Sequence, residues 1–447
     1  MGKKIFIVVF SLFFAMLGLS SCNNNTEKSD DDTAKTQEQT FAADTLLSED
    51  GSFGNDSDGL LTVAFIGGSL TDAQSYTTEE GKAYGGKYWT NIVCDYLTEK
   101  FPNRTIKPIN SGIGGTGTDY GALRFEDTIL RFEPDIVFYD TINDCGFGKE
   151  HCQKYMEAMT RMTQQCEKVP VFIYLYTPYP DYYGTVNYER WKENNGYKQE
   201  IADYYGIGNI DIYSYLFSCF DTSGYTDFYE FIASTNQYVG SGTTWDPHGG
   251  YKFYAEAILK VFNENPGSVI KRPIIREEWF ENGLYKDIAL IKYNIIRPTS
   301  DRFTYTGKWK LYSIENSVSA PAYFVIEKSH GEYAGMSPHK DKHGIMTTTD
   351  QTATLEFSTD ANSVIINFKT VNEPYDMATD VYIDGEFSKE IHSSSIYVGM
   401  SYILTLADFS DGQTHNIKLV MKPSESEIPA FEFVYIGEGY TEAGLKK

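Results

Sequence analysis

The chain has 447 residues, of which 41% are hydrophobic and 15% aromatic, so it is long enough for about two or three domains with substantial cores. Its formal net charge is −24. An acidic balance of this size excludes nucleic acid as a partner, because binding a phosphate backbone needs a basic surface. The same charge repels polyanionic substrates and favours neutral or weakly charged ones.

The first residues are typical of a targeting segment. Lys3 and Lys4 precede an apolar run, Ile5–Leu19, which is shorter than the roughly 20 residues of a membrane-spanning helix. The next residues, Leu19-Ser20-Ser21-Cys22, resemble the lipobox of bacterial lipoproteins. The resemblance implies a signal peptide over residues 1–22, lipidation of Cys22, and export to the outer membrane, where the lipid anchor is the only membrane attachment. An ordinary signal peptide or a single membrane anchor is the alternative.

Residues 23–59 are rich in Asn, Thr, Ser, Asp, Glu and Gly. This composition predicts a disordered tether, because too few apolar groups are available for burial. The acidic run Asp30-Asp31-Asp32 resembles surface-export signals of Bacteroidetes lipoproteins and favours exposure at the cell surface, although a solvated charge run explains it nearly as well.

Residues 60–266 alternate apolar strand-like runs with helix-like segments, which predicts a parallel sheet with helices on both faces. We expect a flavodoxin-like three-layer α/β/α domain. The expected strands are Leu61–Ile66, Ile106–Ile109, Asp135–Tyr139, Val171–Tyr176 and Ile210–Tyr213. The expected helices are Tyr88–Lys100, His151–Cys166, the first part of Tyr188–Tyr213, and Gly250–Phe262.

After Pro266 the pattern changes. Residues 267–300 are expected to form a connector and a first strand, and residues 301–447 an all-β domain, a β-sandwich or jelly roll, because short alternating runs are separated by turn residues. The expected strands are Thr306–Tyr312, Ala322–Ile326, Thr352–Phe357, Ser363–Phe368, Thr379–Ile383, Tyr402–Leu406, Asn416–Met421 and Phe431–Ile436.

Motifs follow the first three expected strands. Gly67 and Gly68 let the chain turn sharply before Ser69, whose hydroxyl is a candidate nucleophile or a helix cap. The glycine-rich run Asn110–Gly117 exposes backbone N–H groups, or is a surface turn. Asn143 either donates its amide to an oxyanion or closes an Asx turn.

A fourth motif, Trp245-Asp246-Pro247-His248, precedes the last helix of the domain. An imidazole oriented by a carboxylate can act as a general base, although a lone histidine near a helix start is more often structural.

Together these residues resemble the SGNH hydrolases, also called the GDSL family, in the order of the four sequence blocks. The resemblance covers 60–266 and implies a serine esterase in which Ser69 is the nucleophile, His248 the base and Asp246 its orienting acid. It implies an oxyanion hole formed by the N–H groups of Ser69 and Gly115 and the amide of Asn143.

The sequence departs from the family pattern twice. Gly68 stands where the family often has an aspartate, and only Pro247 separates Asp246 from His248, where the family usually has two residues. A Ser–His dyad oriented by a backbone carbonyl or by another carboxylate is therefore the alternative to a full triad.

The expected substrate is an acylated glycan or another small ester, with O-acetyl groups on a polysaccharide favoured. Trp245, Trp191 and Tyr179 are candidates for stacking on sugar rings, although ordinary packing is the commoner role of such aromatic residues. An inactive carbohydrate-binding lipoprotein and a lipid or thioester hydrolase are the alternatives. We expect no cofactor and no metal, because no zinc-type Cys/His spacing is present. The sequence leaves the oligomeric state open.

Overall fold

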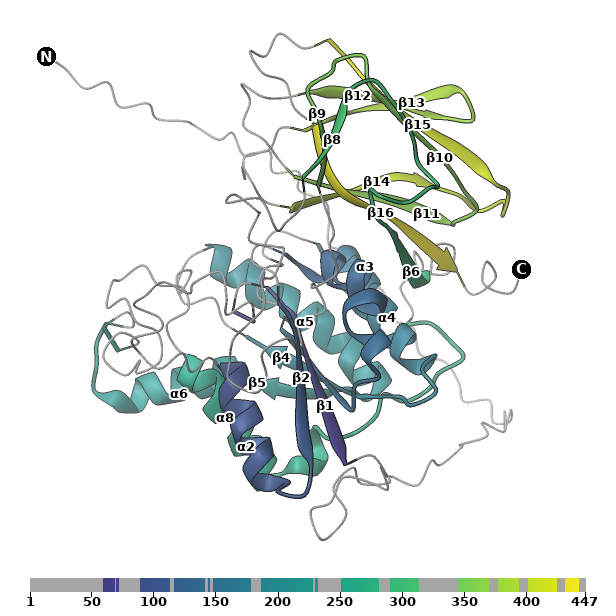
Figure 1. Ribbon diagram of the computed structural model, residues 1–447. Helices are drawn as coiled ribbons and strands as arrows, with labels where there is room; N and C mark the ends of the chain where they lie inside the picture. The colour runs from purple at the N-terminus through teal and green to yellow at the C-terminus, as the bar shows by residue number, and fades with distance from the viewer. Residues whose placement is uncertain are drawn as a thin grey trace, which may run out of the picture. The chain divides into compact units, whose positions relative to one another are not determined.

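The structure is a computed structural model of the chain (Figure 1). The predicted signal peptide, Cys22 and all of the predicted tether except Gly59 lie outside the residues that it describes. None of the helices among the described residues is long and apolar enough to cross a membrane. The described residues are 59–68, 70–71, 89–112, 116–140, 144, 148–177, 186–227, 230–231, 251–280, 290–312, 345–369, 377–393, 401–423 and 431–441.

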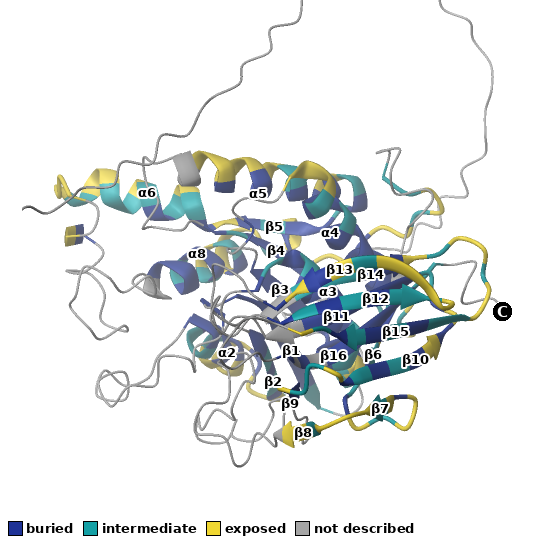
Figure 2. Ribbon diagram, turned by 90° about the horizontal axis from the view of Figure 1, so that it is seen from above, coloured by how far each residue is buried: buried dark blue, intermediate teal, exposed yellow. Residues whose placement is uncertain are grey.

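The first half of the chain is built on a 5-stranded parallel sheet in the order β2-β1-β3-β4-β5. This is the flavodoxin-like order of doubly wound folds, as the sequence predicted. Strands β1, β3 and β4 are almost wholly buried (Figure 2), which explains why they read as continuous apolar runs. The strands of the sheet are β1 (Leu60–Gly67), β2 (Thr105–Gly112), β3 (Ile136–Asp140), β4 (Val171–Tyr176) and β5 (Gly208–Asp211).

Helices cover both faces of this sheet. Alternate side chains of β1 enter two different cores: Phe65 packs with α2 and α8, and Ile66 packs with α3, α4 and α5. The three layers predicted from the sequence are therefore confirmed. The helices are α2 (Trp89–Lys100), α3 (Thr118–Thr128), α4 (Lys149–Gln164), α5 (Val186–Tyr205), α6 (Ile212–Ser223) and α8 (Tyr251–Glu264), with short 3₁₀ turns η1 (Leu130–Phe132) and η3 (Pro266–Ser268).

One expected strand boundary in this half was wrong. The strand expected at Ile210–Tyr213 ends at Asp211, because the Asp211 side chain accepts a hydrogen bond from the Ser214 N–H at 2.8 Å and starts α6. Helices α3 and α6 were not among the helices named from the sequence.

The second half contains two antiparallel sheets with a shared core, and so forms a β-sandwich. One sheet has the order β13-β12-β15-β10-β7; the other, β14-β11-β16-β9-β8, also has β6 paired to β16. A jelly-roll connectivity stays a prediction. The strands are β6 (Leu290–Ile296), β7 (Thr304–Thr306), β8 (Trp309–Tyr312), β9 (Ile345–Thr348), β10 (Thr354–Thr359), β11 (Ser363–Lys369), β12 (Ala378–Ile383), β13 (Glu386–His392), β14 (Ser401–Asp408), β15 (His415–Met421) and β16 (Phe431–Thr441).

The single strand expected at Thr306–Tyr312 is two strands, β7 and β8, which belong to different sheets. Gly307 separates them with φ of +88°, a left-handed conformation that glycine adopts without strain. The strand expected at Ala322–Ile326 lies outside the described residues, and β9 and β13 were not expected.

The sandwich packs against the α/β half within one compact unit. Tyr293 of β6, Ile365 of β11 and Tyr435 of β16 belong to the same buried cluster as α3 and α4. The Asn367 amide donates to the Tyr120 hydroxyl at 3.0 Å across this boundary. The two halves therefore share a hydrophobic core.

Candidate active site

The carboxyl ends of β1, β2 and β3 lie next to one another at one edge of the parallel sheet. Gly67 is in register with Gly112 of β2, and Ile66 is in register with Tyr139 of β3. The three motifs of the sequence begin at these strand ends, where open α/β sheets bind their ligands. The predicted residues Ser69, Gly115, Asn143, Asp246 and His248 themselves lie outside the described part of the chain.

Gly67 at the end of β1 leaves no room for a side chain. A Cβ atom there would lie 2.5 Å from the Thr71 Oγ1 atom, 2.8 Å from the Asp140 Cβ atom and 2.9 Å from the Asp140 carbonyl oxygen. The glycine is therefore required by a close approach to β3, beside the turn that leads to Ser69.

Buried Asp140 joins three segments at this edge. One carboxylate oxygen accepts a hydrogen bond from the Thr71 hydroxyl, and the other accepts one from the Thr177 hydroxyl, each at 2.9 Å. Thr71 lies two residues after Ser69, and Thr177 directly follows β4. The Asp140 carboxylate thus fixes the segments that follow β1 and β4, the two strands that flank β3.

The turn after β1 is also held from β2 and α2. The Asn110 amide donates to the Thr71 carbonyl at 3.0 Å, while its oxygen accepts from the Gly112 N–H at 2.9 Å. The Trp89 indole N–H donates to the Leu70 carbonyl at 2.9 Å. Asn110, which the sequence placed in a backbone-exposing run, instead lies in β2 and connects the end of this strand to the segment around Ser69.

Arg124 of α3 is a buried cation beneath this edge. Its guanidinium donates to the carbonyl and hydroxyl oxygens of Ser111 and to the Gly67 carbonyl, the latter at 3.4 Å. It lies 5.3 Å from the centroid of the Tyr120 ring. Sequence reasoning missed both Arg124 and Asp140, because their partners are distant in the chain and no local pattern identifies them.

The predicted sugar-stacking residues divide into two groups. Trp191 is 1% exposed and stacks on Tyr176, with the ring centroids 5.9 Å apart and the planes at 3°. Its place in the packed interior contradicts a role as a sugar platform, because no open ring face remains. Trp245 and Tyr179 lie outside the described residues.

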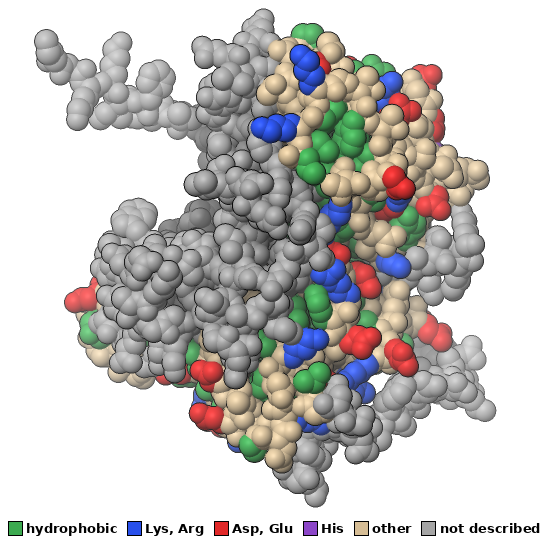
Figure 3. Space-filling model, in the orientation of Figure 1, with side chains coloured by type: hydrophobic (Ala, Val, Ile, Leu, Met, Phe, Trp, Pro, Cys, Tyr) green, Lys and Arg blue, Asp and Glu red, His purple; other side chains and the backbone are tan. Residues whose placement is uncertain are grey.

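The described titratable side chains show no group of three or more His, Cys, Asp or Glu residues that could hold a metal ion. Cys94, Cys152 and Cys166 are free thiols. On the face drawn in Figure 3, Lys and Arg side chains are interspersed with Asp and Glu side chains over the described surface.

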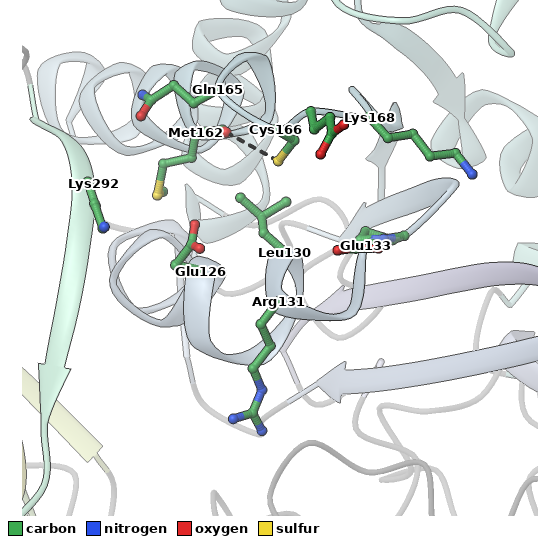
Figure 4. A pocket seen from close by; sticks show the side chains of 11 residues that line it. Glu126, Leu130, Arg131, Glu133, Met162, Gln165, Cys166, Lys168 and Lys292 are labelled. Atoms are coloured by element: carbon green, nitrogen blue, oxygen red, sulfur yellow. Dashed lines mark hydrogen bonds between the residues drawn. The ribbon is translucent and has the colours of Figure 1, made fainter.

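A cavity of about 670 Å³ lies elsewhere in the α/β half (Figure 4). Its wall includes Glu126 of α3, Pro134 just before β3, Cys166 just after α4, and Lys292 of β6. Pro134 marks the amino end of β3, so the cavity is at the edge of the sheet opposite to the carboxyl ends. We therefore do not assign it to the predicted ester-hydrolase site.

A flavodoxin-like sheet whose first three strands are followed in the sequence by Gly-Gly-Ser, glycine-rich and asparagine motifs is typical of one class of protein, the ester hydrolases. Comparison with protein families agrees. The model of the GDSL-like lipase/acylhydrolase family matches residues 65–229, and this part of the chain is a carboxylic ester hydrolase domain of that family.

Solved structures are similar over both halves. A two-domain esterase, CEX, active on acetylated mannans and co-crystallised with mannopentaose, is 15% identical, with a TM-score of 0.62 over 86% of this chain and 91% of that one. Another crystal structure of a two-domain esterase (CEX) active on acetylated mannans is 14% identical, with a TM-score of 0.61 over 86% of this chain and 92% of that one. A comparison with curated proteins finds no match.

Proposed function

We propose that the protein is a serine esterase that removes O-acetyl groups from a neutral polysaccharide. One observation carries the proposal: a GDSL-like acylhydrolase domain in which Gly67, at the crowded end of β1, leads into the candidate nucleophile Ser69. A serine placed at the carboxyl edge of a parallel sheet is exposed to substrate, and neighbouring strand ends can supply the remaining groups.

In the proposed mechanism, His248 takes the proton from the Ser69 hydroxyl, and the Ser69 oxygen attacks the carbonyl carbon of the acetyl ester. The N–H groups of Ser69 and Gly115 and the amide of Asn143 stabilise the negative charge on the carbonyl oxygen. The protonated imidazole then gives its proton to the departing sugar oxygen. His248 then takes a proton from water, which attacks the acetyl-enzyme; acetate leaves, and the imidazole returns the proton to the Ser69 oxygen. We assign Asp246 the orienting role, with a dyad as the alternative.

Two observations support a carbohydrate ester as the substrate. The two-domain architecture resembles that of an esterase active on acetylated mannans. The formal charge of −24 disfavours polyanionic substrates and is compatible with a neutral glycan. Within this proposal, Trp245 and Tyr179 are the candidates for contact with sugar rings.

The test is acetate release from chemically acetylated mannan by the purified full chain. We expect acetate release by the wild type and at most about a thousandth of that rate from Ser69→Ala, because the covalent step is lost. Ser268→Ala, in the short η3 turn, is the matched control and should retain the wild-type rate.

Equal rates for Ser69→Ala and the wild type would refute the assignment of the nucleophile. Binding of mannan without acetate release would instead favour a carbohydrate-binding protein. Faster hydrolysis of long-chain acyl or thioester substrates than of acetylated mannan would favour a lipid or thioester hydrolase.

We also propose that the protein is an exported lipoprotein, anchored at the outer membrane through acyl chains on Cys22. The lipobox-like run before Cys22 supports this. Metabolic labelling with palmitate should mark the wild type and should not mark Cys22→Ala. Equal labelling of the two would refute lipidation at this position.

A further inference from the structure

Lys198 forms a buried ion pair with Asp144, the residue that follows the proposed oxyanion donor Asn143 in the chain. We propose that Asp144 and Lys198, together with Thr118, act as positioning residues that hold the Asn143 segment and the glycine-rich loop at a fixed separation. This inference rests on the proposed function, because it concerns the donors of the same reaction.

Asp144 is wholly buried and joins helices α3 and α5. Its Oδ1 atom accepts a hydrogen bond from the Thr118 backbone N–H at 2.8 Å, and its Oδ2 atom accepts one from the Thr118 hydroxyl. The Lys198 ammonium forms an ion pair with the same Oδ2 atom, and both side chains are 0% exposed. The Tyr139 hydroxyl of β3 donates to the Thr118 hydroxyl oxygen.

The backbone of Asp144 is held as well. The Asn194 amide donates to the Asp144 carbonyl oxygen. Asn194 and Lys198 are four residues apart on α5 and therefore share one face of that helix. Helix α5 thus contacts both the side chain and the main chain of Asp144, which leaves Asp144 little freedom to shift.

The positions in the chain connect this cluster to the donors. Asn143 is bonded directly to Asp144, and Gly115 lies three residues before Thr118, the first residue of α3. The Thr118 N–H is one of those at a helix start that lack a partner within the helix, and Asp144 supplies one. A carboxylate that fixes the start of α3 therefore also fixes where the glycine-rich loop ends.

The energetics favour positioning over stability as the role of the pair. Burying two charges costs several kcal/mol in desolvation, and well-packed apolar replacements of such pairs are often neutral or stabilising. Burial raises the pKa of the Tyr139 phenol well above its usual value and that of the Cys152 thiol to about 12, so both neighbours are neutral near pH 7. What the pair provides is a directional contact between Asp144 and the helices α3 and α5.

The first test replaces the Thr118 side chain. Thr118→Val keeps the shape but removes the hydroxyl, whereas Thr118→Ser keeps the hydroxyl. With p-nitrophenyl acetate as substrate, we expect kcat/KM of Thr118→Val to fall by about 10- to 100-fold, because displacement of a reacting group by about 1 Å can cost 100-fold. The inhibition constant of phenylboronic acid, whose adduct with serine places an oxygen among the donors, should rise in parallel. Thr118→Ser should restore both values.

The matched control is Asp135→Asn at the amino end of the same sheet. Asp135 is also a buried carboxylate: it accepts from the Thr62 N–H at 2.7 Å and pairs with Lys168 at 2.5 Å. We expect this variant to have a lower Tm but wild-type values of kcat/KM and of the phenylboronic acid inhibition constant. Wild-type values of both for Thr118→Val, whatever its Tm, would overturn the inference.

A second variant covers the case in which Thr118→Val does not fold. Asp144→Asn combined with Lys198→Met removes both charges together, so neither is left buried alone. We expect near wild-type Tm with a reduced kcat/KM; near wild-type Tm with full kcat/KM would also overturn the inference. Failure of the proposed function is distinguishable, because the wild type and Ser69→Ala would then hydrolyse the ester equally.

Discussion

Single atoms at the end of β1 decide the shape of the candidate site. Replacing Gly67 by alanine would place a methyl group 2.8 Å from the Asp140 Cβ atom and 2.5 Å from the Thr71 hydroxyl. The Asp140 backbone cannot move away without disturbing β3. We therefore expect Gly67→Ala to lower the unfolding free energy by about 1–3 kcal/mol and to reduce kcat at least tenfold, because the turn bearing Ser69 must shift.

Gly196 is the matched control for this substitution. It is exposed on α5, and an added Cβ atom there would meet nothing within 4 Å. Gly196→Ala should raise the stability by about 0.5–1 kcal/mol, since alanine is the better helix former. Urea unfolding and p-nitrophenyl acetate hydrolysis measure both variants. Equal stability of Gly67→Ala and the wild type would contradict the packing at this strand end.

At the scale of elements, one histidine contacts aspartates in two turns of the sandwich. His415, the first residue of β15, contacts Asp384 in the β12–β13 turn at 2.7 Å and Asp411, which precedes β15, at 3.0 Å. Its hydrogen bond to Asp384 is the main cause of a raised pKa of the imidazole. Hydrogen bonds from the Asn416 N–H and from His415 lower the pKa of Asp384 in turn.

A pH dependence of stability follows. The pKa of His415 is higher in the folded protein than its unfolded-state value of 6.5, so protonated His415 stabilises the fold. This stabilisation is complete below pH 6.5 and is lost as the pH rises through the folded-state pKa. We expect the Tm difference between the wild type and His415→Gln to be larger near about pH 5.5 than near about pH 9. The same difference at both pH values would contradict the ion pairing. In an Asp384→Asn, Asp411→Asn background the dependence should disappear.

The elements differ in how far they could be predicted. Strands β1, β3 and β4 are continuous apolar runs, so the parallel sheet could be predicted from the sequence, and with it the strands that the motifs follow. Asp-Gly pairs are typical of turns between strands, and Asp384 of Asp384-Gly385 adopts φ of +52° in the β12–β13 turn. By contrast, β7 and β8 lie in one alternating run, and only the pairing of each strand with a different sheet separates them.

The candidate site was foreseeable only in part, for a physical reason. The motif residues stand out because they follow strands in a fixed order. The residues that hold those segments in place contact partners far away in sequence: Asp140 meets Thr71 across 69 residues, and Arg124 meets Gly67 across 57. Such contacts depend on the tertiary fold and have no local signal. The burial of Trp191 is a further consequence of packing that periodicity does not reveal.

For the whole molecule, the sandwich forms part of the wall of the α/β core. Tyr120 and Leu123 of α3 are buried against it, and Arg297 forms an ion pair with Asp127 across the boundary. Removing the residues after Pro266 would expose this face of α3, whose first residue lies next to Asp144. We therefore expect a chain that ends at 266 to aggregate or to lose esterase activity. A soluble truncated protein with the kcat/KM of the full chain would contradict this.

Labelling with a fluorophosphonate, followed by peptide mapping, tests the central claim most directly. We predict one phosphonyl group on Ser69 of the full chain, strongly slowed labelling in His248→Ala, and none in Ser69→Ala. Modification of a different serine, or labelling of His248→Ala at the wild-type rate, would contradict the proposed mechanism.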